Sequence, residues 1–397
     1  MSESTQTTSF DVIIVGGGMV GTAQACALGD SPLSVALIEA NLPNDDWPAD
    51  SFDLRVSAIT HASEKFLEQL GAWQTIDRER TSAYHDMRVW DAGGDGSIHF
   101  DCAEIGETNL GHIVENRVIN RALTLRAKQF ANITVYCPHS PHRLQLDSDS
   151  ATLELADGTR LETNLLVGAD GGRSWVRQQA GIAVSTRDYQ QTAVVANVTT
   201  EFPHQRTAWQ RFLPTGPLAF LPLTNDNISS IVWSTTADEA QRLCELDEAS
   251  FNSELEAAFE ATLGKIVSSG PRASFPIKGQ HASHYVRPHL ALVGDAAHTI
   301  HPLAGQGVNL GFADARCLAE TVLSAHDAHR SIGSFKVLRR YERSRRGDNL
   351  LMLESMGAFK QLFSNNTPGL RELRNAGLNV ANRSSVIKHF FMEKALG

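Results

Sequence analysis

The sequence lacks the features that mark nucleic-acid-binding, secreted or membrane-spanning proteins. Its 35 basic side chains against 45 acidic ones give a formal net charge of −10, which argues against general nucleic-acid binding. No run approaches the roughly 18 apolar residues of a membrane span. The first ten residues are polar and lack the basic-then-apolar order of a signal peptide. Five cysteines without a CxxC pair predict reduced thiols, a cytoplasmic protein and no metal site.

What the sequence does contain begins with a strand, a glycine-rich turn and a helix. The β-branched run 12–15 stops at glycine, as a buried parallel strand does, and helix-compatible residues follow over 19–28. Between them, Gly16, Gly18 and Gly21 have the spacing of a dinucleotide-binding turn. The first glycine permits the tight turn, the second lets a pyrophosphate approach the backbone, and the third lets helix and strand pack closely. We therefore predict a bound dinucleotide here, rather than a glycine-rich turn that binds nothing.

A second apolar run, residues 34–38, ends at Glu39. A carboxylate at this strand end can accept hydrogen bonds from an adenosine ribose. It would also repel the 2′-phosphate of NADP. NAD and FAD share this fingerprint, so the turn alone leaves both open.

Two further apolar runs end at an aspartate far downstream. The run 165–167 leads to Asp170, and the run 290–293 leads to Asp295. Asp295 is placed to bind a hydroxyl-rich chain, with a strand-end cap as the alternative, and Asp170 either contacts the cofactor or braces its own turn. The glycine-rich stretch Gly305–Gly311 then predicts a helix start, whose free N–H groups favour the negative charge of a reduced flavin.

These motifs, in this order, resemble the class A flavoprotein monooxygenases, the group that includes p-hydroxybenzoate hydroxylase. The stretch Gly294–Gly311 resembles the motif that holds the ribityl chain of FAD and lines its isoalloxazine. The stretch Gly168–Arg177 looks like the motif associated with FAD and with its reduction by NAD(P)H. The resemblance implies FAD as cofactor, with NAD(P)H or another electron donor and O2 as co-substrates. It also implies flavin-edge candidates at Pro302 and Gly305, and cofactor contacts at Gly307, Val308 and Asn309.

Shorter stretches resemble the ubiquinone-biosynthesis hydroxylases, and most strongly the bacterial 2-polyprenylphenol hydroxylases among them. They are Arg55–Ile59, Tyr84–Met87, Val89–Asp91, Gly111–Asn116 and Arg339–Arg345. Arg55 corresponds to the family arginine near the FAD pyrophosphate, and Asn116 occupies a position where many relatives carry Arg or Gln against the flavin.

The resemblance implies hydroxylation of the aromatic ring of a polyprenylphenol in ubiquinone biosynthesis, through a flavin C4a-hydroperoxide. The alternatives are another ring position in the same pathway, a flavin reductase or oxidase of isoprenoids, and a non-catalytic FAD-bound subunit of a biosynthetic complex. The polyprenylated substrate and the biosynthesis complex are the expected partners.

The fold class follows from the same patterns. Residues 185–235 are rich in β-branched residues and turn signals, which predicts an antiparallel sheet, and the pattern is helical from about residue 315. With the resemblance, we expect an α/β protein with a Rossmann-like FAD-binding domain of the p-hydroxybenzoate hydroxylase type, an interleaved, mainly antiparallel substrate domain and a helical C-terminus. The expected divisions are 1–75, 106–182 and 276–335 for the first, 76–105 and 183–275 for the second, and 336–397 for the third.

A pair of histidines and a basic cluster can each be explained by the fold alone as well as by a function. His298 and His301 share a spacing that suits one helix face, but no third metal ligand is near, so we interpret them as packing histidines near the flavin. The basic cluster 339–346 is either a solvated helix face or a contact with an anionic membrane surface. The second interpretation would make the cytoplasmic protein peripheral to the inner membrane.

Overall fold

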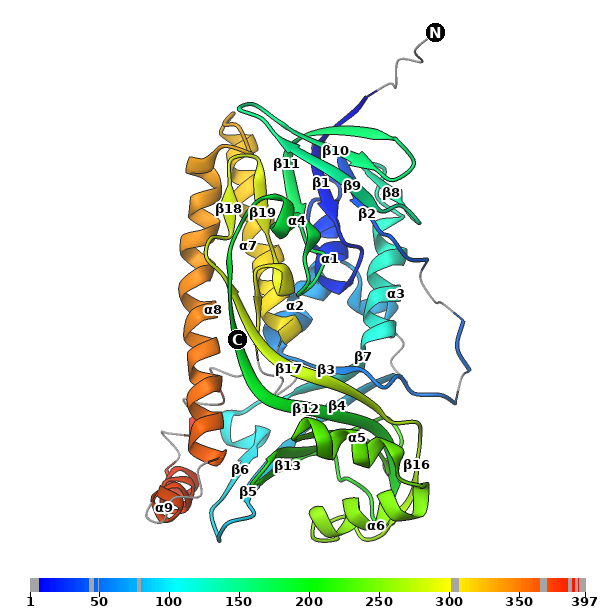
Figure 1. The fold of residues 1–397 in the computed structure, drawn as a ribbon, viewed down its shortest axis with the longest axis vertical. Coiled ribbons are helices and arrows are strands. Elements are labelled where there is room, and N and C mark those ends of the chain that lie inside the picture. The colour runs from blue at the N-terminus through cyan, green and yellow to red at the C-terminus, as the bar shows by residue number, and fades with distance from the viewer. Residues whose placement is uncertain are drawn as a thin grey trace.

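The computed structural model describes residues 7–42, 46–48, 50–76, 80–300, 307–364, 370–384, 388–389 and 392. Two large sheets and a small one form the body of the molecule. Figure 1 shows the first sheet in the upper half, the second in the lower half, and the long helix α8 along one side of both. The structure confirms the expected α/β fold, with an antiparallel sheet beside the nucleotide-binding sheet and a helical C-terminal region. The predicted domain divisions stay predictions.

The first sheet has a parallel centre, in the order β8-β2-β1-β11-β19. These strands are β1 (Thr8–Val15), β2 (Val35–Ile38), β8 (Ile133–Tyr136), β11 (Arg160–Gly168) and β19 (Leu290–Leu292). Antiparallel strands extend it: β18 (Val286–Arg287) beside β19, β10 (Ala151–Leu155) beside β11, and β9 (Pro141–Leu146) beside β10. Strands β2 and β19 and the last four residues of β1 and β11 are buried, which explains the unbroken apolar runs there.

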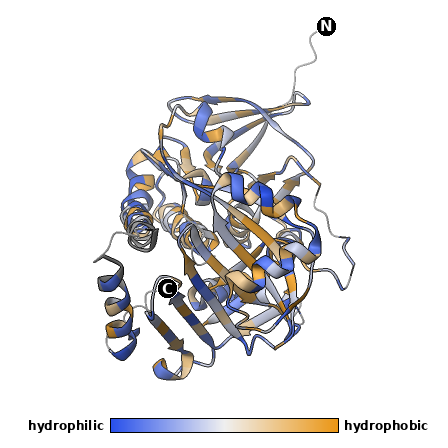
Figure 2. Ribbon diagram, turned by 60° about the horizontal axis from the view of Figure 1, so that its bottom comes forward, coloured by the Kyte–Doolittle hydropathy of each residue, from blue (hydrophilic) through white to orange (hydrophobic). Residues whose placement is uncertain are grey.

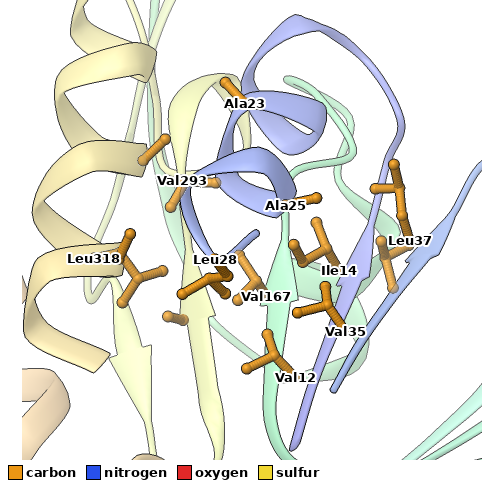
Figure 3. Close-up of a cluster of buried hydrophobic side chains, with 14 of the residues drawn as sticks. Val12, Ile14, Ala23, Ala25, Leu28, Val35, Leu37, Val167, Val293 and Leu318 are labelled. Atoms are coloured by element: carbon orange, nitrogen blue, oxygen red, sulfur yellow. The ribbon is translucent and has the colours of Figure 1, made fainter. Parts of the chain in front are cut away.

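Helices pack on this sheet through small and branched side chains. They are α1 (Met19–Ala27), α2 (His61–Gln69), α3 (Asn116–Ala127), α4 (Trp175–Gln179), α7 (Gly307–Asp327) and α8 (Phe335–Ser364). Figure 3 shows Ala25 of α1 beside Ile14 of β1, and Ala23 of the same helix and Leu318 of α7 belong to the same buried cluster. Alanines let α1 approach the sheet closely, and each buried Val, Ile or Leu contributes about 1.5–3 kcal/mol. The turn before α1 therefore stands on a rigid base.

The second sheet is antiparallel apart from one edge pairing, β13 with β5, which is parallel. Its strands are β5 (Asp86–Asp91), β6 (Ser97–Asp101), β12 (Val184–Thr200), β13 (Thr207–Leu213), β14 (Gly216–Pro222), β15 (Ile228–Thr235), β16 (Ile266–Ser269), β17 (Ala273–Ala282) and β20 (His298–Thr299). Alternate residues such as Phe220 and Trp233 pack under α5 (Ala237–Glu245) and α6 (Glu248–Ala258). Figure 2 shows hydrophobic colour through the central strands and mixed colour on these surface helices. One face of the sheet is therefore core, and the other is available to a site.

The remaining elements connect the two large sheets. They are the small sheet of β3 (Val56–Ile59), β4 (Thr81–Tyr84) and β7 (Gly111–Glu115), and the short turns η1 (Trp73–Thr75), η3 (Cys102–Ile105) and η4 (Gly294–Ala296). Helix α9 (Leu370–Arg383) covers the edge strand β6 in an uncommon way. Its Asn375, Asn379 and Asn382 side-chain oxygens accept hydrogen bonds from three backbone N–H groups of residues 96–99, at 2.7, 3.2 and 3.0 Å. The asparagines thus take the place of a neighbouring strand.

Candidate active site

The loops that follow the parallel strands leave the first sheet side by side. Val15 lies opposite Ile38 and Gly168, and Gly168 lies opposite Leu292, so the carboxyl ends of these strands share one edge. A cavity of about 560 Å³ opens at this edge and extends to the face of the second sheet that α5 and α6 do not cover. The three motifs that are far apart in the sequence therefore meet at one end of a single cavity.

The glycine turn shows a different reason for each of its three glycines. Gly16 has φ of +109°, and a Cβ there would lie 2.4 Å from the carbonyl oxygen of Ala169. A Cβ on Gly21 would lie 1.9 Å from the carbonyl oxygen of Gly16. A Cβ on Gly18 would meet no heavy atom within 4 Å, because this residue faces the cavity. Gly16 and Gly21 are required by the fold, whereas Gly18 is open to the cavity, and its contact with the pyrophosphate stays a prediction.

Gly18 also marks the N-terminus of α1, where backbone N–H groups have no side-chain cap. The first turn of α1 carries no acidic residue. Free N–H groups and the helix dipole together favour an anion at this point. This end of the cavity suits the pyrophosphate of a dinucleotide.

Glu39 supports the glycine turn. Its carboxylate accepts hydrogen bonds from the backbone N–H groups of Gly17 at 2.7 Å and of Asn41 at 2.8 Å. The sequence interpretation did not include this bracing. A further contact with a ribose stays a prediction.

Asp295 faces the cavity from the loop that follows β19. Gly294, with φ of +59°, makes the sharp turn that carries it there. The side chain is open to the cavity but lies deep, so burial raises the pKa of its carboxyl, while His298 and Arg55 oppose the shift. Arg55 also lines the cavity, and its guanidinium lies 6.0 Å from the centre of the Phe275 ring.

Asp170 braces its own turn, the role that the sequence left as an alternative to a cofactor contact. One carboxylate oxygen accepts the hydroxyl of Ser174 and the other accepts the backbone N–H of Val176, at 2.5 and 3.0 Å. Burial raises the pKa of Asp170, and these hydrogen bonds partly offset the shift. Its neighbours Ala169 and Gly171 line the cavity, so a direct cofactor contact by Asp170 stays a prediction.

Arg177 ties two of the three loops together, which sequence reasoning did not anticipate. The side chain is 4% exposed. It donates to the carbonyl oxygens of Gly172 and Ala296, both at 2.8 Å. Its place at the end of the motif Gly168–Arg177 was visible, but its backbone partner 119 residues away was not.

A second unanticipated feature is a buried polar network behind the Asp295 loop. Asp314 of α7, fully buried, accepts hydrogen bonds from His298 at 2.5 Å and from the backbone N–H of Gly294 at 3.1 Å. Its other oxygen accepts from Arg345 at 2.9 Å and Asn349 at 3.1 Å. Burial alone would raise the pKa of Asp314, but His298 and Arg345 bring it below its ordinary value. The network holds the loop against α7 and α8.

This network changes the interpretation of two sequence features. His298 is 2% exposed and packs against the Tyr285 ring, as expected for a packing histidine. The cluster 339–346 is neither wholly a solvated face nor wholly a surface for a membrane, because Arg345 points inward to Asp314. Arg339 pairs with Glu342 on its own helix.

The other residues predicted to contact the cofactor either line the cavity or make hydrogen bonds within the protein. Gly307 and Val308 line the cavity. Asn309 ties α7 to β3, donating to the Ala58 carbonyl at 2.7 Å and accepting from the Thr60 N–H at 3.2 Å. Pro302, Gly305 and His301, with their predicted places near the flavin, lie outside the described residues.

Asn116 both lines the cavity and makes a hydrogen bond within the protein. It lines the cavity, and its side-chain oxygen accepts the Ser57 hydroxyl at 2.7 Å.

The far end of the cavity is formed by the second sheet and is mostly apolar. Small side chains alternate along its strands and leave space for a flat group: Ala193, Ala208 and Ala219, with Val195 and Val232 beside them. Arg55, Asp295 and Lys278 supply the charges among the described lining residues. One cavity therefore combines an anion-binding end with an apolar end.

Comparison with known proteins agrees with this geometry. A family model described as FAD binding domain matches residues 9–348. The 3-demethoxyubiquinol 3-hydroxylase of Escherichia coli K12 is 39% identical, over 98% of both chains. The chain belongs to the FAD-dependent monooxygenases, in the family of ubiquinone-biosynthesis hydroxylases.

Other relatives cover nearly the whole chain. The ubiquinone hydroxylase UbiL of Rhodospirillum rubrum is 39% identical, over 98% of this chain and 89% of its own. The human mitochondrial ubiquinone biosynthesis monooxygenase COQ6 is 36% identical, over 97% and 92%. The crystal structure of p-nitrophenol 4-monooxygenase from Pseudomonas putida shares the fold, with a TM-score of 0.79 at 20% identity over 98% and 99% of the chains.

The cofactor of this family is FAD, and the residues present fit it. The uncapped N-terminus of α1 and the open space at Gly18 suit the pyrophosphate. Asp295 suits the hydroxyl-bearing ribityl chain between the two ends of the cavity. The class uses NAD(P)H and O2 as co-substrates.

Proposed function

We propose that this flavoprotein hydroxylates the aromatic ring of a prenylated phenol during ubiquinone biosynthesis. The observation that supports the proposal most is the single cavity, which leads from the nucleotide turn to an apolar wall of small side chains. Bound FAD would supply the activation of O2 that places one oxygen atom on the ring. The names of relatives, which include a 3-demethoxyubiquinol hydroxylase, support a substrate from this pathway.

The chain's own residues would bind, orient and exclude water. The α1 N-terminus would hold the pyrophosphate, and Asp295 the ribityl hydroxyls. Arg177 and Asp314 would keep the two flanking loops in register. The apolar wall of β12 to β15 would position the ring and keep water from the reacting atoms.

The proposal has two competing forms. The enzyme hydroxylates either a 2-polyprenylphenol or another ring position of an intermediate in the same pathway. The 39% identical relative named for 3-demethoxyubiquinol favours the second form. Mass spectrometry of quinone intermediates in a strain lacking this protein separates them, because the intermediate that accumulates lacks the hydroxyl that the enzyme adds. With ¹⁸O2, the purified enzyme should place labelled oxygen in the product. Unlabelled product would indicate a reductase or oxidase, and a bound flavin that no donor reduces would indicate a non-catalytic subunit.

We also propose a peripheral contact with a membrane, where a polyprenyl substrate would reside. Among the described residues, no helix is long and apolar enough to cross a bilayer. On α8, however, Arg340 and Arg343 are exposed about two to three turns before Leu350 and Leu351, which are 41% and 69% exposed. A basic stretch followed by exposed leucines suits an anionic surface. Flotation with anionic and with neutral vesicles tests this, and equal binding to both would contradict it.

A further inference from the structure

The apolar wall of the cavity contains three buried polar side chains, those of Gln210, Ser230 and Ser234. Gln210 on β13 is 6% exposed and Ser230 on β15 is fully buried, and both line the cavity. Among the described residues, the Ser230 hydroxyl has no hydrogen-bond partner. Gln210 brings an amide to the same wall.

Unpartnered polar groups in a buried wall are unfavourable, because they have lost water without gaining another partner. Native proteins satisfy most buried polar groups, and the exceptions need an explanation. Gln210 and Ser230 both line the cavity. A ligand with oxygen atoms would supply the missing hydrogen bonds.

The strand register separates the two groups across the wall. Gln210 lies opposite Ala219, and Ala219 lies opposite Val232, two residues along β15 from Ser230. Two strand spacings place the β13 and β15 backbones about 10 Å apart. A flat ring between them can meet the amide with one edge and the hydroxyl with the other. Between the two, Ala219 and Val232 provide an apolar floor.

We propose that Gln210 and Ser230 bind the oxygen substituents of the substrate's aromatic ring and so determine its orientation in the cavity. This inference rests on the proposed function, because it takes the substrate to be an oxygenated ring with an apolar chain. Gln210 can donate and accept, and Ser230 can do the same. They are specificity-determining residues, and they take no part in the chemistry of the flavin.

Ser229 offers a matched control for Ser230. It precedes Ser230 on the same strand and is also fully buried, and its hydroxyl also lacks a partner within the described part of the chain. Successive side chains of a strand point to opposite faces, and Ser229 is not part of the cavity wall. Ser229→Ala therefore removes the same hydroxyl oxygen from the same strand, but on the face that does not line the cavity.

The test is a binding titration of the FAD-loaded enzyme, without an electron donor, followed by the absorbance change of the flavin. The probes are 2-prenylphenol and prenylbenzene, which differ only in the hydroxyl. We expect the wild type to bind the phenol at least tenfold more tightly than prenylbenzene. Ser230→Ala and Gln210→Leu should each lower this ratio about five- to tenfold, while Ser229→Ala should leave it unchanged.

A ratio unchanged in both Ser230→Ala and Gln210→Leu would overturn the proposal. So would an equal loss in Ser229→Ala. Ser230→Ala removes one atom, so the test does not depend on how Gln210→Leu folds. The binding ratio needs no turnover, whereas the labelled-oxygen assay of the proposed function does. The two can therefore fail separately.

Discussion

Alanine substitutions in the glycine turn can distinguish a glycine that serves ligand binding from one that the fold requires. In Gly18→Ala the new methyl group would meet no protein atom within 4 Å, and the backbone (φ −72°, ψ −179°) is one that alanine adopts readily. Alanine restricts the unfolded chain, which stabilises, and is a poorer N-cap than glycine, which destabilises. We expect the free energy of unfolding of the apoprotein to change by less than about 1 kcal/mol.

FAD binding should respond quite differently to Gly18→Ala. The methyl group would occupy the space where a phosphate oxygen approaches the N-terminus of α1. We expect a loss of at least tenfold in FAD affinity, about 1.4 kcal/mol. Denaturant unfolding of the apoprotein and titration of FAD by quenching of its fluorescence measure the two quantities separately.

Two comparison variants complete the experiment. In Gly21→Ala the Cβ would lie 1.9 Å from the Gly16 carbonyl oxygen, so the backbone must move, and we expect a loss of about 3 kcal/mol or more in stability. Gly347 is exposed on α8 with no heavy atom near its missing Cβ, so alanine there should stabilise by about 1 kcal/mol and leave FAD affinity unchanged. Wild-type FAD affinity in Gly18→Ala would refute the placement of the pyrophosphate, and wild-type stability in Gly21→Ala would refute the steric argument.

Three further predictions concern the loops around the cavity. Asp295→Ala should lower FAD occupancy of the purified protein while the apoprotein still folds; intact occupancy and activity would contradict the ribityl contact. Asp314→Asn should cost about 3–5 kcal/mol of stability at pH 7, because it leaves Arg345 buried without its carboxylate. The folded-state pKa of Asp314 is lowered, so its stabilisation is present above the ordinary carboxylate range and is lost as the pH falls below about 4. Unfolding curves from pH 7 to pH 3 should show a shallower pH dependence in Asp314→Asn, and an equal slope would contradict this. Arg177→Gln should weaken FAD binding about tenfold by freeing the loops at Gly172 and Ala296, and FAD affinity equal to wild type would contradict the tie.

Local patterns were enough to predict the elements that position the cofactor. The apolar run before Gly16 and the one before Glu39 are buried parallel strands, and the region 185–235 is the antiparallel β12 to β15. These predictions succeed because a strand buried on both faces must be apolar throughout, and because a tight turn requires glycine.

Local sequence patterns did not predict most of the side-chain contacts in the site. Asp170, expected either to contact the cofactor or to brace its own turn, and Asn309, expected at the cofactor, both bond to nearby protein groups, and their cofactor contacts stay predictions. Arg345 looked like part of a surface cluster and instead pairs with a buried carboxylate on another helix. Whether a polar side chain faces a ligand or the protein depends on which element packs against it, and no local spacing contains that information.

The sequence by itself predicted a dinucleotide-binding turn at residues 16–21, and its resemblance to the class A flavoprotein monooxygenases indicated that the dinucleotide is FAD. Only the tertiary structure decided that Asp170 braces its own turn and that Arg345 pairs with the buried Asp314 of another helix. Only the structure, likewise, brought Gln210 and Ser230 to one apolar wall. The physical reason is the same in both cases. A motif specifies the backbone path over a few residues, whereas the space beside each residue is set by chain segments that lie far away in the sequence.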